Sequence, residues 1–213
     1  MSIADIRTQY SLKSLLEADA FPDAMDQFQH WWNEATHAEL TEVNAMTLAT
    51  ASADGLPDAR IVLLKDFSSK GFTFFTNYES RKGQELAQNP RACLVFFWKE
   101  LERQVRITGN VAKISKADSE TYFFSRPVGS QLGAWASRQS QVLPNREFLA
   151  EKLSTLESEV NAGKSFGKPD YWGGYIVQPS SIEFWQGRPS RLHDRLLYTL
   201  QADGGWKIER LSP

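Results

Sequence analysis

Several cations and amides stand at the ends of apolar runs, where an unpaired charge is costly unless an anion binds beside it. Arg60 and Lys65 bracket the run IVLL, and Arg81 and Lys82 follow Ser80 at the start of a predicted helix. A helix N-terminus offers backbone N–H groups, and two adjacent cations there suit a phosphate. A solvated helix start with two surface cations gives the same pattern. The other members of this set are Gln104, Arg126, Gln139, Arg191, His193 and Arg195.

The segment EFWQGRPSRLHDRLLY is the densest of these regions. Arg191, His193 and Arg195 alternate along it, so on a β-strand their side chains would share one face. That face would carry two permanent cations and a titratable imidazole. An exposed edge strand with alternating charge is the competing interpretation, and Asp194 and Glu183 are available to pair with the cations.

Other chemistries lack their motifs. The sequence has no GxGxxG or P-loop pattern, no G-x-S-x-G elbow and no zinc-type Cys/His spacing. His30 and His37 could share a helix face but have no third ligand, so no metal site is expected. A net charge of −2 argues against a nucleic-acid binder. We expect no transmembrane helix and no signal peptide, and the single Cys93, in an apolar run, fits a buried thiol in a cytoplasmic protein.

Short strands joined by hairpins dominate the predicted elements. The runs AMTLATAS and RIVLLK flank an Asp54-Gly55 turn, and Ser68 to Gly71 form a second turn before GFTFFT. RIVLLK, being apolar throughout, is typical of a strand buried on both faces. Further strands are expected in the following stretches: RACLVFFW, residues 105–111, YWGGYIVQ, SIEFWQ, RLLYTL and GWKIERL.

Helices are predicted around and between these strands. Phe28, Trp31, Trp32 and Ala35 recur at helical spacing within residues 23–40. Later helices are expected after Ser80, ending at Asn89-Pro90; after the Ser115 cap, ending near Arg126-Pro127; and over residues 146–161, with Leu149, Leu153, Leu156 and Val160 inward. The polar stretch SQLGAWASRQSQ is predicted to be a loop.

No regular βαβ alternation is present, which argues against a parallel doubly wound sheet. The expected fold is mainly β with flanking helices (α+β), built as an antiparallel barrel. We expect one domain over residues 21–213, preceded by a polar arm over residues 1–20 that is compatible with a mobile lid. Arg7 and Tyr10 stand one helical turn apart in this arm.

Six separated motifs carry a specific resemblance. They are RIVLLK, FFTNYESRKGQEL, ERQVRITG, YFFSRPVGSQLGAWASRQS, YWGGY, and EFWQGRPSRLHDR with the final WKIERLSP, and they span Ala45 to Pro213 in this order. The chain resembles the pyridoxine/pyridoxamine 5′-phosphate oxidase family, FMN enzymes of vitamin B6 metabolism with a split-barrel fold. The arm's RTQY resembles a weaker element of the same family. The wider superfamily of FMN-binding split barrels shares the fold and not the C-terminal motif.

The resemblance implies an oxidase that converts pyridoxamine or pyridoxine 5′-phosphate to pyridoxal 5′-phosphate while O2 is reduced to H2O2. It also implies a homodimer in which each FMN is shared across the subunit interface. The residues implied for FMN are Arg60, Ile61, Val62, Leu63, Leu64, Lys65, Phe75, Thr76, Arg81, Lys82, Gln104, Gln139, Ser140, Trp185 and Arg195. Arg81 and Lys82 would hold its phosphate.

The resemblance also assigns the substrate site. The residues implied for the substrate are Arg7, Tyr10, Lys65, Tyr122, Arg126, Ser130, Arg191 and His193. Tyr122, Arg126 and Ser130 would take its phosphate, and Arg7 to Tyr10 would form a lid. Arg191 and His193 are the catalytic candidates, for orienting the substrate and handling its proton.

Two alternatives belong to other functional classes. One is a non-oxidase flavoprotein of the same barrel, such as a flavin reductase. The other is a module that binds pyridoxal phosphate without turning it over. The RLHDR segment and the set of Tyr122, Arg126 and Ser130 argue against the first, since they would serve a second phosphorylated ligand.

Overall fold

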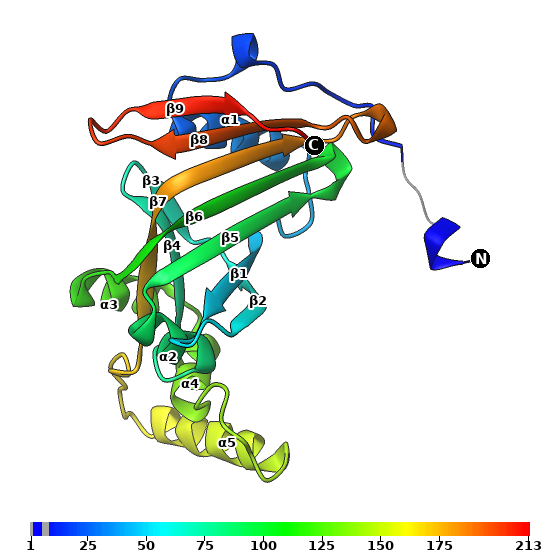
Figure 1. Ribbon diagram of the computed structural model, residues 1–213. Coiled ribbons are helices and arrows are strands. Elements are labelled where there is room, and N and C mark those ends of the chain that lie inside the picture. The colour runs from blue at the N-terminus through cyan, green and yellow to red at the C-terminus, as the bar shows by residue number, and fades with distance from the viewer. Residues whose placement is uncertain (1, 6–8) are drawn as a thin grey trace.

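One antiparallel sheet organises the chain, which a computed structural model describes over residues 2–5 and 9–213 (Figure 1). The strand order is β2-β1-β5-β6-β7-β4-β3, with β8 beside β7 and β9 beside β8. The strands are β1 (Ala45–Ala51), β2 (Pro57–Leu63), β3 (Asp66–Ser68), β4 (Gly71–Asn77), β5 (Arg91–Trp98), β6 (Arg103–Lys113), β7 (Trp172–Gln186), β8 (Asp194–Leu200) and β9 (Trp206–Arg210). The α-helices are α1 (Ala24–His37), α2 (Arg81–Gln88), α3 (Lys116–Ser125), α4 (Val128–Ala136) and α5 (Glu147–Asn161).

The sheet curls because the strands at the two ends of its strand order, β2 and β3, follow one another in the chain. β2 and β3 lie at opposite ends of the strand order, yet only Leu64 and Lys65 separate them. The Leu64 N–H donates to the Asn44 carbonyl (2.8 Å) and the Lys65 N–H donates to the Thr73 carbonyl (2.9 Å). The edges therefore meet, and the predicted antiparallel barrel with flanking helices is confirmed as an antiparallel half-barrel.

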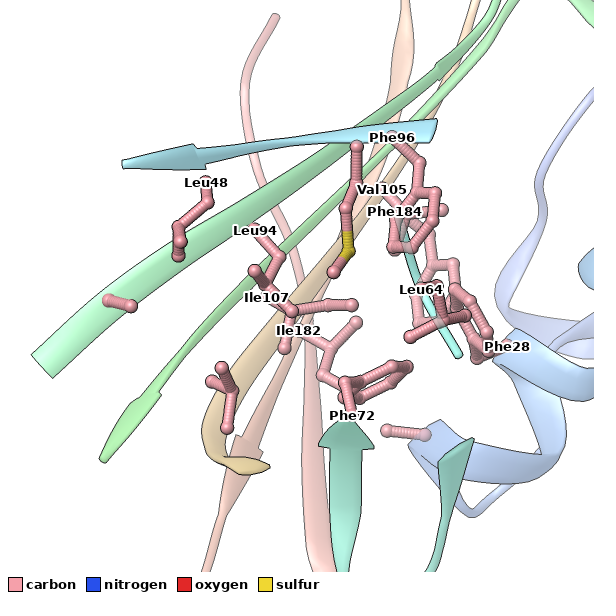
Figure 2. Packing of buried hydrophobic residues seen from close by; sticks show 14 of the residues in the cluster. Phe28, Leu48, Leu64, Phe72, Leu94, Phe96, Val105, Ile107, Ile182 and Phe184 are labelled. Carbon is pink, nitrogen blue, oxygen red and sulfur yellow. The ribbon is translucent and has the colours of Figure 1, made fainter. Parts of the chain in front are cut away.

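The core fills the inside of this curl. Leu48, Leu94, Ile107 and Ile182 face one another across successive strands, and all four are fully buried (Figure 2). Helix α1 covers one end of the curl through Phe28, Trp31 and Ala35, as predicted, whereas Trp32 of the same predicted buried face is only half-buried. Asp23 caps α1 by accepting from the Met25 and Asp26 N–H groups.

Strand β2 is exposed, so the prediction that RIVLLK is buried on both faces was wrong. β2 pairs with β1 alone, at the end of the strand path, and its residues alternate between exposed and half-buried. Ile61 is 65% exposed, whereas Leu64, just beyond the strand, turns into the core. An apolar run does not reveal by itself whether a second neighbour covers it.

The stretch SQLGAWASRQSQ is not all loop, because α4 runs from Val128 to Ala136. Pro127 precedes its first turn, and Leu132 and Ala136, four residues apart, form its buried stripe. The four-residue spacing of Leu132 and Ala136 indicates a helix, but the polar composition of the stretch favoured the loop prediction. Helix α5 contacts α4 away from the sheet (Figure 1), and its predicted inward residues Leu149, Leu153, Leu156 and Val160 are only half-buried.

The two predicted strands YWGGYIVQ and SIEFWQ are one strand, β7, which pairs with β6 from Tyr175 to Gln186. The register shifts between Thr108 and Gly109, where a Cβ on Gly109 would lie 2.0 Å from the Gln178 carbonyl oxygen. This bulge lets β7 pair with β4 before it and β8 after it. Within the described residues, no helix is long and apolar enough to cross a membrane.

Candidate active site

A cavity of about 690 Å³ opens between the end of β2, strand β4 and helices α2 to α4. Such a volume is within the ordinary range for a cofactor or ligand site. The predicted site residues that line it are Ile61, Val62, Leu63, Lys65, Phe75, Thr76, Lys82, Tyr122, Arg126, Ser130 and Gln139. The lining residues that sequence reasoning missed are Asn77, Pro127, Gly133, Ala134, Ser137 and Trp172. Those from Pro127 to Ser137 fall on or beside the helix that was predicted as a loop.

Lys82 is a buried cation in the cavity wall, 8% exposed. Its Nζ donates to Gln139 Oε1 (2.8 Å), Thr76 Oγ1 (3.4 Å) and Ser80 Oγ (3.5 Å), all neutral acceptors. Within the described residues, no carboxylate forms an ion pair with it. Burial lowers the pKa of Lys82, because the charged form loses hydration that no carboxylate replaces at contact distance. An anion entering the cavity would restore that stabilisation.

Helix α2 holds this lysine in place. The Ser80 hydroxyl accepts from the Gly83 N–H (3.3 Å), which confirms Ser80 as the predicted N-cap. A Cβ on Gly83 would lie 2.1 Å from the Tyr78 carbonyl oxygen, so only glycine allows the helix to start this close to the β4 end. The first turn of α2 is therefore fixed against the cavity by its cap and by a close backbone approach.

Arg60 and Arg81 differ from Lys82, because both pair with carboxylates. Arg60 Nη2 lies 2.7 Å from Asp58 Oδ2 and 3.2 Å from Glu85 Oε2. Arg81 Nε lies 3.1 Å from Asp58 Oδ2 and 3.1 Å from Glu85 Oε1. Neither arginine lines the cavity. The phosphate role of Arg81 remains a prediction; its bonds to the carboxylates use Nε and leave the forked end of the guanidinium available.

Arg126, half-buried, is another cavity cation that has no carboxylate partner among the described residues, as is the exposed Lys65. Its Nη2 donates to the Ser130 carbonyl (2.9 Å), and its guanidinium carbon lies 4.7 Å from the centre of the Trp172 ring. Nη1 is buried and, in the part of the chain that the structure describes, has no hydrogen-bond partner. Burial lowers the pKa of this guanidinium. A buried N–H left unbonded in a ligand-sized cavity suits an anionic acceptor.

Three stacked aromatic rings form the wall beside Arg126. The Phe75 ring lies 3.9 Å from that of Tyr122 and 5.4 Å from that of Trp172, nearly parallel to both. Tyr122 and Arg126, on the last turn and at the C-cap of α3, come together with Ser130 of α4. The structure thus places in one cavity the three residues predicted to share a phosphate.

The other predicted residues gather at the far end of the sheet, in what we call the hairpin group: Tyr10, Gln104, Trp185, His193 and Arg195. Gln104, Trp185 and Arg195 are register partners across β6, β7 and β8. The Trp185 ring lies 4.6 Å from that of His193, and Tyr10 stands edge-on to Trp185 at 5.7 Å. None of the five lines the cavity.

Arg191 and His193 do not continue the β8 strand, so the prediction of one strand face shared with Arg195 was wrong. β8 begins at Asp194, and Pro189 to Arg191 form a short 3-10 turn. Ser190 and Arg191 both have positive φ (56° and 62°), which breaks the alternation that a strand requires. Arg191 is exposed in this turn.

His193 accepts a hydrogen bond from the Arg188 backbone N–H at its Nδ1 (3.1 Å). A backbone N–H can only donate, so the neutral ring carries its proton on Nε2. Burial, and then the nearby Arg191, lower the pKa of His193, which favours that neutral form. Of the remaining predicted residues, Leu64 lies in the core, Ser140 is exposed with φ 71°, and Arg7 lies outside the described residues.

The cavity and the hairpin group are far apart within one chain. Strand β7 reaches both regions: Trp172 lines the cavity, and Trp185 lies 13 residues further along the same strand (185 − 172). At about 3.3 Å per residue, this is roughly 43 Å measured along the strand. The outer sheet surface between them carries Ile61 and Phe97, 65% and 56% exposed. An apolar surface of this kind suits contact with another protein surface.

Sequence comparisons match two family models to the chain. The model described as pyridoxamine 5′-phosphate oxidase matches residues 33–158, and the one described as pyridoxine 5′-phosphate oxidase C-terminal dimerisation region matches residues 172–213. A pyridoxine/pyridoxamine 5′-phosphate oxidase from Cyanothece sp. is 57% identical over 213 residues, covering 100% of this chain and 99% of that protein. One from Cupriavidus pinatubonensis is 56% identical over 211 residues, covering 99% of each.

Solved structures show the same fold. PhzG from Burkholderia lata, in complex with tetrahydrophenazine-1-carboxylic acid, superposes with a TM-score of 0.88 at 29% identity, covering 95% of this chain and 100% of that one. A pyridoxamine 5′-phosphate oxidase-related, FMN binding protein from Nostoc punctiforme gives 0.70 at 16% identity, covering 87% and 97%. The second likeness shows the fold alone.

Proposed function

The chain belongs to the pyridoxamine 5′-phosphate oxidase family, and from that membership we propose that it is an FMN-dependent oxidase producing pyridoxal 5′-phosphate. The alcohol pyridoxine 5′-phosphate and O2 would give pyridoxal 5′-phosphate and H2O2. The amine pyridoxamine 5′-phosphate would also consume water and release ammonia. Bound FMN supplies the two-electron acceptor that passes the electrons on to O2.

The observation that carries this proposal is the pair of buried or half-buried cavity cations that have no carboxylate partner among the described residues. Lys82 and Arg126 stand in one cavity, on different elements: the charge of Lys82 meets only neutral acceptors, and Arg126 Nη1 has no hydrogen-bond partner among the described residues. Two phosphorylated ligands would supply two anions. We assign the FMN phosphate to Lys82 with Arg81, and the substrate phosphate to Arg126 with Tyr122 and Ser130. The stacked Phe75, Tyr122 and Trp172 add a flat surface suited to aromatic rings.

The hairpin group completes this site from a second subunit in our proposal. Within one chain it lies at the other end of β7 from the cavity, roughly 43 Å away along the strand. A homodimer formed through the exposed outer surface, with its family-type dimerisation region at residues 172–213, would bring one subunit's hairpin group over the partner's cavity. FMN would then lie at the interface, with Gln104, Trp185 and Arg195 beside it.

His193 and Arg191 are assigned to the substrate in this arrangement. Because Nδ1 of His193 is occupied by the Arg188 N–H, its Nε2–H is the group free to donate to a substrate oxygen or nitrogen. Arg191, held in a left-handed turn and exposed, provides a permanent cation next to it. Together they would orient the carbon that is oxidised.

The similarity to PhzG favours a second candidate within the same family, an oxidase of a reduced phenazine carboxylic acid. Arg126 and the aromatic wall would also accept a carboxylate on a flat ring. The relatives at 54–57% identity cover the full chain and carry the pyridoxine/pyridoxamine 5′-phosphate oxidase name, whereas PhzG is 29% identical. We therefore place the phosphorylated pyridine first.

Anaerobic reduction tests the proposal. The FMN-loaded protein is mixed without O2 with pyridoxine 5′-phosphate, pyridoxamine 5′-phosphate, unphosphorylated pyridoxine, or a reduced phenazine carboxylic acid, and flavin absorbance is followed. We expect bleaching with the phosphorylated pyridines, and recovery of the colour with H2O2 formation when air is admitted. Bleaching by a nicotinamide cofactor alone would support the flavin reductase instead. Binding of pyridoxal phosphate without any bleaching would support the carrier module.

A further inference from the structure

The N-terminal arm is held at several points, and the one next to Tyr10 is the buried carboxylate of Glu102. Further along the arm, Asp194 and Arg210 bind Leu15, and Arg188 binds the Lys13 carbonyl. Glu102 follows the 3-10 turn between β5 and β6 and is 9% exposed. Its Oε2 accepts from two consecutive backbone N–H groups of the arm, Ser11 (2.8 Å) and Leu12 (3.0 Å). Both bonds are charge-assisted, and neither Ser11 nor Leu12 lies in a helix or strand.

The backbone of Glu102 binds the other side of the same junction. Its carbonyl accepts from the Gly187 N–H (2.7 Å) and from the Gln186 side-chain amide (3.2 Å), at the end of β7. Glu102 has φ 54°, a left-handed conformation that a glutamate adopts at some cost. A glycine or asparagine would fit this backbone better, so the strain points to a need for the longer carboxylate side chain.

The consequence of this junction is the position of Tyr10. Tyr10 directly precedes the two clamped amides, and its ring stands edge-on to Trp185 (5.7 Å) and to His193 (5.9 Å). A Cβ on Gly187 would lie 2.7 Å from Tyr10 Cβ and Cγ, so the arm sits directly on the end of β7. The arm is thus pressed onto the two aromatic residues of the hairpin group.

We propose that Glu102 is a positioning residue: its carboxylate clamps the Ser11 and Leu12 amides and thereby holds Tyr10 on Trp185 and His193, closing the substrate side of the site. It acts through the arm and does not touch the substrate. The kinetic part of this inference rests on the proposed function, whereas the clamping of the arm can be measured without any substrate.

The variants separate the clamp from the fold. Glu102→Gly removes the carboxylate and suits the left-handed backbone, so a loss is not caused by strain. Glu102→Gln is the conservative rescue, because both amides bond to one oxygen and an amide oxygen can accept both. Glu100→Ala is the matched control, an exposed glutamate on the same 3-10 turn. Gly187→Ala retains the Glu102 carboxylate and pushes mainly on Tyr10, since the new Cβ would lie 2.7 Å from Tyr10 Cβ and 3.1 Å from Glu102 Cβ.

The first readout is chymotrypsin cleavage after Tyr10, because the N–H of that peptide bond is the Ser11 N–H bound by Glu102, followed by mass spectrometry on the FMN-loaded dimer. Cleavage requires local release of the arm, so its rate reports the fraction released. We expect about a tenfold faster cleavage in Glu102→Gly, a change of at most about twofold in Glu102→Gln, and none in Glu100→Ala. An unchanged rate in Glu102→Gly would overturn the clamp, whatever the protein oxidises.

The second readout is steady-state oxidation of pyridoxine 5′-phosphate. We expect KM to rise about tenfold in Glu102→Gly and Gly187→Ala with kcat within about twofold, because the arm contributes to binding and not to the chemical step. Glutamine at 102 should restore KM. Faster cleavage with unchanged KM would overturn the positioning role. If the unaltered protein does not oxidise this substrate, the proposed function fails, and the cleavage readout still decides the clamp.

Discussion

The cavity and the hairpin end of the sheet differ in whether their cations form ion pairs with carboxylates. At the hairpin end, Arg195 Nε donates to Glu183 Oε1 (2.8 Å), and the same carboxylate pairs with Arg106 (3.2 Å). Arg188 and Arg210 share Asp194 at 3.5 Å and 2.8 Å. In the cavity, Lys82 and Arg126 have only neutral partners among the described residues.

The difference separates cations that are paired with carboxylates from buried or half-buried cations that are not. The bond to Glu183 raises the pKa of Arg195, whereas burial lowers the pKa of Lys82 and of Arg126. Removing a paired cation should therefore weaken the fold, and removing an unpaired one should weaken ligand binding. Flavin affinity, substrate KM and the free energy of unfolding measure these effects separately.

The largest effect is expected at Lys82. Lys82→Met should weaken FMN binding by about 3 kcal/mol, the upper end for a hydrogen bond to a charged group, or roughly 150-fold in Kd. The apo protein should melt no lower than the unaltered one, because methionine removes a desolvated charge. Flavin fluorescence titration and thermal unfolding of the apo form provide the two measurements. Lys70→Met, in the exposed turn after β3, is the matched control.

Lys82 should make both the FMN affinity and the free energy of unfolding of the apo protein depend on pH. Its folded pKa lies below the ordinary 10.5, so the unfolded chain holds that proton more tightly, and the apo free energy of unfolding rises with pH between the two values. FMN binds the charged form, so flavin affinity is full below the folded pKa and falls as pH rises through it. Lys82→Met should make both slopes shallower; part of the slope in the free energy of unfolding remains, because burial also lowers the pKa of Lys168. Slopes as steep as those of the unaltered protein, or unchanged flavin affinity, would contradict the assignment of Lys82.

A smaller effect is expected at Arg126, which is only partly buried. Arg126→Met should raise KM for pyridoxine 5′-phosphate roughly 30-fold, because a charge-assisted bond to the substrate phosphate, with a free energy of about 2 kcal/mol, is lost. Flavin content should remain complete, since the FMN phosphate is assigned to a different cation. Loss of flavin in this variant, with a normal KM once FMN is in excess, would reverse the two phosphate assignments.

The smallest effect is expected on the stability of the flavin-free protein when Arg195 is replaced. Arg195→Met should lower the free energy of unfolding of the apo protein by about 1 kcal/mol, because Glu183 keeps only Arg106 as partner. Urea denaturation of the flavin-free protein measures this. If Arg195→Met is neutral while Lys82→Met destabilises, the contrast between the two regions is wrong.

Local elements could be predicted from the sequence because their causes are local. Phe28, Trp31 and Ala35 recur at helical spacing and form the buried face of α1. Gly55 and Gly71 take the positive φ values that their turns require (88° and 131°), and Ser80 and Ser115 cap the helices that follow them. The motif order was also sufficient to indicate the family.

The sequence did not predict other features correctly, because those features depend on residues that are distant in the chain. The exposure of β2 depends on which strand lies beside it, and a run of apolar letters contains no such information. Arg191 and His193 alternate with Arg195 as a strand would, but two left-handed residues in the β7–β8 connection break the strand. The clamp of Glu102 on Ser11 and Leu12 joins residues 90 positions apart, which no spacing suggests.

The sequence by itself determined which side chains could bind phosphate, because residue type sets charge and hydrogen-bonding capacity. Arg81 and Lys82 were equivalent at that level, as neighbours on one helix start. Tertiary structure separated them: Asp58 from β2 and Glu85 from α2 pair with Arg81, while Lys82 is turned into the cavity among neutral acceptors. The reason is that a charge's partners are set by the curl of the sheet, which brings β2, β4 and α2 together.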